Sequence, residues 1–204
     1  MSRRYSRDSR SNVYRLLRSK IRTLTEQRNW LTCAAYWTLE SMLHQERDEL
    51  EQVDYCKARA YLSLALFYKE SHELEKAAEY YEKAAELMLK HPNCSKGAKL
   101  QLANALDCKA RSAMHKKNYT DASKFFLQSS KLYEEIGKHK EAKYSKLRAY
   151  ESQAHQQAMN GEYLAASKTM ETAAEIVKEA DEKFYFSSIA DSYIYKALYS
   201  QKKQ

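Results

Sequence analysis

The strongest constraint on the fold is an internal repeat. Residues 72–88 read HELEKAAEYYEKAAELM and residues 161–177 read GEYLAASKTMETAAEIV, each with two alanine pairs and a final Glu followed by two apolar residues. Two further copies appear when the large residue before the first small pair is taken as the anchor of each copy. These anchors are Trp30, Leu74, Tyr119 and Tyr163, at spacings of 44, 45 and 44 residues. A near-constant period of this length is typical of repeat proteins.

Residue sizes recur at fixed distances from the anchors. Three positions after each anchor the residue is small, in the series Cys33, Ala77, Ala122 and Ala166. Seven positions after it the residue is large, in the series Trp37, Tyr81, Phe126 and Met170. Offsets of three and seven lie along one face of an α-helix, so small residues permit close helix approach while large ones fill the space beside them. A similar pattern precedes each anchor, and each unit therefore reads as two helices joined by a short turn.

Composition supports long helices. The 204 residues include only three Gly and one Pro, and such a chain has few places to break a helix. We predict an all-α right-handed α-solenoid of about four helix-turn-helix repeats of period 44–45, with a C-terminal capping helix. Gly161 and Asn118 are expected to supply the permissive backbone of two of the turns. The expected organisation is a flexible basic arm at 1–12 and one repeat domain at 13–204, with units at about 13–50, 54–91, 97–136 and 140–180 and a cap at 183–200.

The second unit resembles the tetratricopeptide repeat. Its first helix carries Tyr61, Leu64, Ala65 and Tyr68, and its second carries Ala77, Tyr81 and Ala84. The longer units, with phrases such as KLYEEIGKHKEA, are similar to those of the soluble NSF attachment proteins. The resemblance implies stacked helical hairpins that grip an elongated helical partner, with vesicle fusion or membrane trafficking as the setting. The last residues, YSQKKQ, lack the acidic, leucine-containing end of that family, so only the partner-binding role is carried over.

A stripe of basic residues is predicted along the first helices of the units, which line the concave face of such a solenoid. Equivalent positions of these helices repeatedly carry arginine or histidine: Arg15, Arg18, Arg22, Arg59, Arg111, Arg148 and His155. Arginine suits two-point contact with carboxylate or phosphate. We expect this stripe to bind an acidic or helical protein partner, and the alternative is an ordinary solvated helix face.

Most of the net charge of +8 lies near the N-terminus, since residues 1–28 hold nine basic and two acidic residues. The predicted arm contributes Arg3, Arg4, Arg7 and Arg10. The alternative function is therefore a regulatory repeat protein whose N-terminal region contacts nucleic acid, and contact with an anionic membrane surface or a purely solubilising tail is also open.

No motif for catalysis, a cofactor or a metal is visible. The six histidines lack HExxH spacing, the four cysteines lack CxxC spacing, and phosphate-binding glycine motifs are absent. We therefore expect a non-catalytic scaffold or adaptor without cofactors or metals. Four cysteines without zinc-motif spacing favour a reducing compartment, although their even number leaves disulfides open. No apolar run approaches the length of a membrane span, so a cytoplasmic location is expected, with peripheral association with membranes left open.

Overall fold

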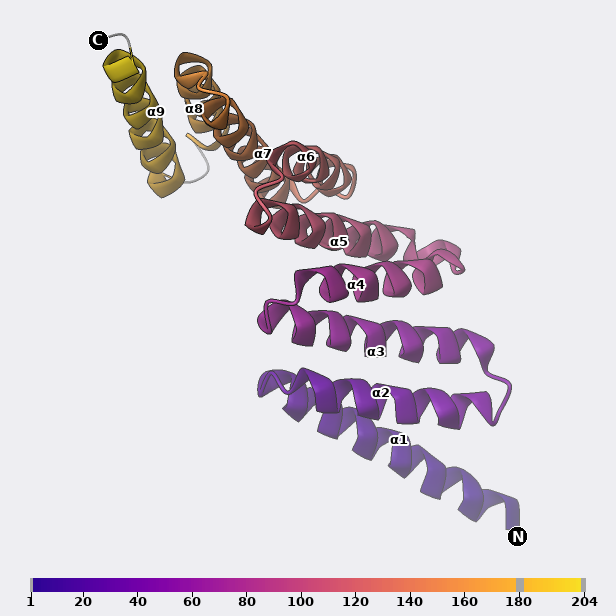
Figure 1. The fold of residues 1–204 in the computed structure, drawn as a ribbon. Helices are drawn as coiled ribbons and strands as arrows, with labels where there is room; N and C mark the ends of the chain where they lie inside the picture. Colours follow the sequence, from indigo (N-terminus) through magenta and orange to yellow (C-terminus); the bar gives the residue numbers. More distant parts are fainter. Residues whose placement is uncertain (1, 179–181, 203–204) are drawn as a thin grey trace. The chain divides into compact units, whose positions relative to one another are not determined.

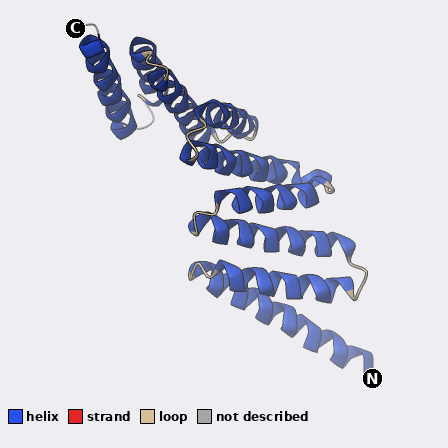
Figure 2. Cartoon of the chain, in the orientation of Figure 1, coloured by secondary structure: helices blue, strands red, loops and turns tan. Residues whose placement is uncertain are grey.

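The computed structural model describes residues 2–178 and 182–202, and side chains within 12–178 and 184–202. These residues form α-helices, one short 3-10 helix and loops, without a strand, so the all-α prediction is confirmed (Figures 1 and 2). In chain order the elements are α1 Ser2–Glu26, α2 Trp30–Gln45, α3 Leu50–Glu70, α4 Leu74–Leu89, η1 Pro92–Cys94, α5 Ser95–His115, α6 Tyr119–Glu135, α7 His139–Met159, α8 Tyr163–Val177 and α9 Glu182–Lys202.

Each anchor found in the sequence is the first residue of a helix. Trp30, Leu74, Tyr119 and Tyr163 begin α2, α4, α6 and α8, the second helices of the four predicted hairpins. The capping helix predicted at 183–200 corresponds to α9. The 44- to 45-residue period of the sequence therefore corresponds to helices that start at equivalent positions in each unit.

The turns inside the hairpins share one backbone conformation. The residue two positions before each anchor has a positive φ, at Arg28 (55°), His72 (61°), Lys117 (58°) and Gly161 (77°). The prediction for Gly161 is confirmed. The prediction for Asn118 is wrong, because its φ is −87° and its side chain instead accepts a hydrogen bond from the Asp121 backbone N–H. Asn118 thus caps α6, and Lys117 takes the left-handed position.

The small-residue series lies in the core. Cys33, Ala77, Ala122 and Ala166 are all fully buried, and the large residues four positions later are buried beside them. Phe126 on α6, for example, packs between Ala110 of α5 and Ala149 of α7. Buried serines also join neighbouring helices: the Ser129 hydroxyl donates to the Ala103 carbonyl at 3.0 Å and the Ser130 hydroxyl to the Ala142 carbonyl at 3.0 Å.

The helices pack in consecutive pairs within two compact units, Met1–Gln101 and Leu102–Gln204, whereas the sequence predicts one continuous domain. In the first unit α2 contacts both α1 and α3, and α3 contacts α4. In the second unit α7 contacts both α6 and α8, and α9 packs on α8. Right-handed stacking of all four repeats would span both units and stays a prediction.

The backbone of the predicted N-terminal arm continues α1, which begins at Ser2. The side chains of Arg3, Arg4, Arg7 and Arg10 lie outside the described residues, and the role of the arm stays a prediction. Among the helices that the structure describes, none combines the length and hydropathy that a membrane-spanning segment requires.

Candidate partner-binding grooves

The first unit contains a groove of about 1040 Å³, which we call groove 1. Its walls come from α1 to α4, from η1 and from the start of α5. Helices α1 and α3 contribute three of the predicted arginines: Arg18, Arg22 and Arg59. Trp37 and Tyr55 form an aromatic wall, with their ring centroids 6.0 Å apart in an edge-to-face arrangement. The guanidinium of Arg59 lies 5.3 Å from the Trp37 ring centroid, a cation–π contact.

The charges of groove 1 are mixed. Arg18 already forms an ion pair within the protein, since its Nε donates to the fully buried Glu40 Oε1 at 2.9 Å. Arg22 lies 3.9 Å from Glu26, a weak and exposed pair. Arg59 is exposed and forms no ion pair with any described residue. Arg59 is therefore the cation of this groove with the most freedom to meet a partner.

Acidic side chains balance these arginines on the wall of groove 1. Glu26, Glu51 and Asp54 line the same space. Asp54 pairs with Lys90 at 3.6 Å, and its carboxylate lies 3.4 Å from His91 Nε2. The groove consequently offers an aromatic wall flanked by charges of both signs, a surface that suits a mixed amphipathic chain better than a uniform polyanion.

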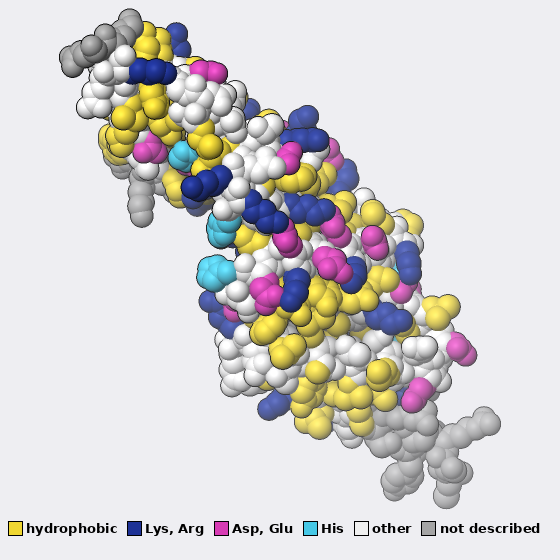
Figure 3. Space-filling view, in the orientation of Figure 1, with side chains coloured by type: hydrophobic (Ala, Val, Ile, Leu, Met, Phe, Trp, Pro, Cys, Tyr) yellow, Lys and Arg dark blue, Asp and Glu magenta, His cyan; other side chains and the backbone are white. Residues whose placement is uncertain are grey.

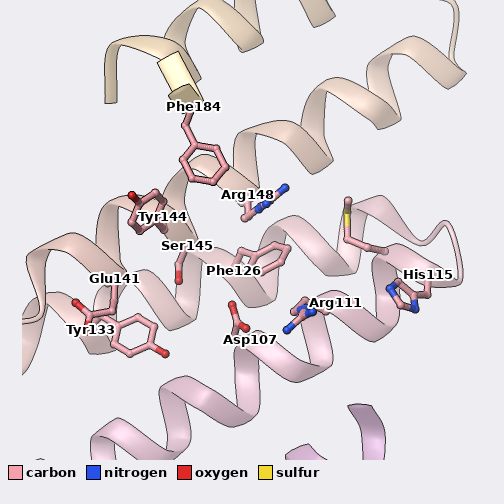
Figure 4. A pocket seen from close by; sticks show the side chains of 11 residues that line it. Asp107, Arg111, His115, Phe126, Tyr133, Glu141, Tyr144, Ser145, Arg148 and Phe184 are labelled. Atoms are coloured by element: carbon pink, nitrogen blue, oxygen red, sulfur yellow. The ribbon is translucent and has the colours of Figure 1, made fainter. Parts of the chain in front are cut away.

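A second groove, groove 2, lies wholly in the second unit and has a volume of about 630 Å³ (Figure 4). Arg111 of α5 and Arg148 of α7 face it, together with Phe126 of α6 and Tyr144 of α7. Phe184 of α9 closes one side and meets Tyr144 edge to face, with the centroids 5.2 Å apart. The capping helix thus supplies part of the aromatic wall.

The two arginines of groove 2 differ in their partners. Arg148 Nη1 donates to Glu151 Oε2 at 2.8 Å, and its guanidinium lies 5.8 Å from the Phe184 ring centroid. Burial of Glu151 raises its pKa despite the nearby Arg148. Arg111 is exposed and forms no ion pair within the described part of the chain. Each groove therefore holds one arginine, Arg59 or Arg111, that lies near an aromatic wall without a carboxylate partner in the protein.

Two acids also line groove 2. Glu141 accepts a hydrogen bond from Lys138 Nζ at 2.6 Å, and this bond, together with that from its own backbone N–H, lowers the pKa of Glu141. Asp107 lies on α5 one turn before Arg111. On the face drawn in Figure 3, basic and acidic side chains are likewise interspersed, and no single basic surface dominates that view.

Five of the seven arginine and histidine positions predicted for the stripe line the two grooves, and two do not. Arg15 donates to the Asn12 side chain at 2.9 Å. His155 lies with its ring centroid 5.3 Å from that of Tyr119 and contacts the Tyr195 hydroxyl at 3.2 Å through Nδ1. Both lie outside the two grooves.

Sequence reasoning missed the aromatic walls. Trp37 and Phe126 appear in it as core residues of the seventh-position series, and Phe184 as part of the cap. Comparisons with models of protein families, with curated proteins and with solved structures each returned no match.

Proposed function

We propose that this chain is a non-catalytic helical-repeat scaffold that binds amphipathic helical segments of a protein partner in groove 1 and groove 2. The observation that carries the proposal is the shared design of the grooves, in which an unpaired arginine lies near an aromatic wall. An acidic side chain of the partner would meet Arg59 or Arg111, and apolar side chains from the same helical face would pack on the rings.

The mixed charge of both grooves favours a protein helix over nucleic acid. A phosphate backbone places negative charge along its whole length and would meet Glu26, Glu51 and Asp54 in groove 1. A partner helix can place basic residues opposite these acids and acidic residues opposite the arginines. A coiled-coil protein of a membrane-fusion complex, which the resemblance to attachment proteins implies, has such a surface.

Charge reversal tests the proposal. Tagged wild-type protein and the Arg59→Glu and Arg111→Glu variants would capture partners from native cell extract with and without nuclease, followed by mass spectrometry. Lys57→Glu and Lys131→Glu are matched controls, because both lysines are exposed, lie on helices that line the grooves and are absent from the groove walls. A captured partner would then be purified for titration calorimetry.

We expect each arginine variant to weaken binding about tenfold to hundredfold, because a desolvated carboxylate of the partner would lose its cation. The control variants should bind like wild type. Unchanged affinity in both arginine variants would contradict the proposal. Loss of all partners on nuclease treatment would instead move the function to the basic N-terminal arm.

A further inference from the structure

A buried cluster of ionisable side chains joins α2 to α3 in the first unit. Glu40 and His44 lie one turn apart on α2, and Cys56 comes from α3. One ligand atom from each residue, an oxygen, a nitrogen and a sulfur, lies within 4.8 Å of the other two. Glu40 and Cys56 are fully buried and His44 is only 7% exposed. Glu40 is the only carboxylate among the buried residues that the structure describes.

Two atoms of this cluster lack hydrogen-bond partners. Glu40 Oε2 and His44 Nε2 are both buried without a partner, and Nε2 lies 3.8 Å from Glu40 Oε1, too far for a hydrogen bond. Buried polar atoms in proteins are nearly always paired, so each unpaired one requires an explanation. A cation between the imidazole and the carboxylate would satisfy both atoms.

The surroundings orient the cluster as they would orient metal ligands. His44 Nδ1 contacts Glu49 Oε2, and an Nδ1–H donated to this carboxylate leaves the lone pair of Nε2 facing Glu40 and Cys56. A carboxylate on the outer ring nitrogen is the usual support of a metal-bound histidine. Arg18 holds Glu40 Oε1 at 2.9 Å, which fixes the carboxylate and leaves Oε2 available.

The repeat itself does not require an ionisable cluster here. At the position of Glu40, ten residues after the anchor, the other three units carry the fully buried Ala84, Ser129 and Ala173. At the position of His44 they carry Met88, Tyr133 and Val177. The same kind of helix pair is therefore packed three times with small and largely apolar residues, and the charged residues of the first unit call for a separate reason.

We propose that Glu40, His44 and Cys56 bind one zinc ion. Zinc accepts carboxylate, imidazole and thiolate ligands in a tetrahedral arrangement, with a water molecule completing the set. Cys56 releases its thiol proton to solvent on binding, so that Glu40 and Cys56 together neutralise the dication. Zinc bond lengths of about 2.0 to 2.3 Å place ligand atoms roughly 3.5 Å apart, so small side-chain rotations would draw the cluster together. Because the ligands come from both helices, a bound ion would tie α2 to α3.

Cobalt(II) is the probe for this site, because thiolate-bound cobalt absorbs in the near ultraviolet and tetrahedral cobalt absorbs strongly in the visible range. Full-length protein, first stripped with a chelator, should bind one cobalt ion per chain with both signals, and zinc should displace it. Cys56→Ala should abolish the thiolate signal. Cys33→Ala is the matched control, since Cys33 is equally buried in the same unit, and it should keep the signal.

A second variant pair tests the supporting carboxylate. Glu49→Gln should lower the zinc affinity about tenfold to hundredfold, the usual effect of losing such support. Glu51→Gln on α3 should leave the affinity unchanged. These variants retain all three ligands, so they remain informative if Cys56→Ala fails to fold.

Three results would overturn the proposal. One is the absence of cobalt signals in folded wild-type protein at excess metal. Another is cobalt binding without a thiolate signal, which would indicate adventitious surface binding. The third is a thiolate signal that Cys56→Ala retains, which would place the metal at another cysteine.

Discussion

Removal of Arg18 should destabilise the first unit far more than removal of a neighbouring arginine. Glu40 is 0% exposed, and Arg18 Nε is the cationic donor on its carboxylate at 2.9 Å. Breaking a fully buried ion pair by removing one partner costs about 3 to 5 kcal/mol, because a buried charge remains uncompensated. The Arg18 side chain is 57% exposed, and water can replace part of its contribution. We therefore expect Arg18→Ala to lower the free energy of unfolding by about 2 kcal/mol.

Tryptophan fluorescence gives a clean assay for this effect. The two tryptophans, Trp30 and Trp37, both lie in the first unit, so their signal in a urea titration follows that unit alone. A chelator in every sample removes any contribution of bound metal. Arg22→Ala is the matched control on the same helix, since its side chain is 85% exposed and lies 3.9 Å from Glu26, and we expect a loss below about 0.5 kcal/mol.

A second substitution at Glu40 tests the cause of the loss. Adding Glu40→Ala to Arg18→Ala should recover most of the lost stability, because it removes the uncompensated charge. Alanine fits the fold at this position in the second and fourth units, at Ala84 and Ala173. Equal losses for Arg18→Ala and Arg22→Ala, or no recovery in the double variant, would refute the reasoning.

Three further predictions concern the core and the titrating groups. Phe126→Ala, at a side chain that is 2% exposed, should cost about 3 to 5 kcal/mol in urea denaturation followed by circular dichroism, and a loss below about 1 kcal/mol would contradict the packing. Burial raises the pKa of Glu151 above its unfolded value, so this group favours the folded state below the unfolded pKa and loses that effect as pH rises through the folded pKa. The stability of Glu151→Gln minus that of wild type should therefore be larger at pH 7 than at pH 4. Denaturation midpoints that differ by the same amount at both pH values would contradict this prediction. Burial, with the charge of Glu40, raises the pKa of Cys56 to about 12. In metal-free native protein at pH 8, alkylation of Cys56 should therefore be more than about a thousandfold slower than that of a free cysteine. Mass spectrometry would follow the alkylation, and the partly exposed Cys94 should react first.

The hairpins could be predicted from the sequence because each depends on local rules that recur. The second helix of each hairpin, from the one that starts at Trp30 to the one that starts at Tyr163, is identified by three features. These are a large residue at the helix start, a small residue three positions later and a large residue seven positions later. The left-handed turn residue was harder to predict. Its position follows from where the next helix begins, so Lys117 takes it although Asn118 is the residue type that favours it.

The grooves could be predicted only in part, because a groove depends on several helices at once. Positions on one helix face are fixed by the 3.6-residue period, and Arg111 and Arg148, which the sequence places on one stripe, both line groove 2. Phe184 belongs to the capping helix, and Glu141 lies seven residues before Arg148 on α7. Neither residue lies at a repeat position that carries arginine or histidine in several units. Whether they line the groove depends on how neighbouring helices are aligned side by side, and the residue pattern of a single helix does not specify that alignment.

The buried cluster shows what an internal repeat reveals about residues that the fold does not need. Because the four units pack by the same rules, each column states which residues the packing requires, as an alignment of relatives would. A column that reads Glu40, Ala84, Ser129 and Ala173 requires a small residue, since the last three are fully buried. Glu40 satisfies that column only with the help of Arg18, and it brings an unpaired oxygen into the core. A position that departs from its column at such a cost serves something other than packing, and under the zinc proposal that role is metal binding together with the nearest buried groups, His44 and Cys56.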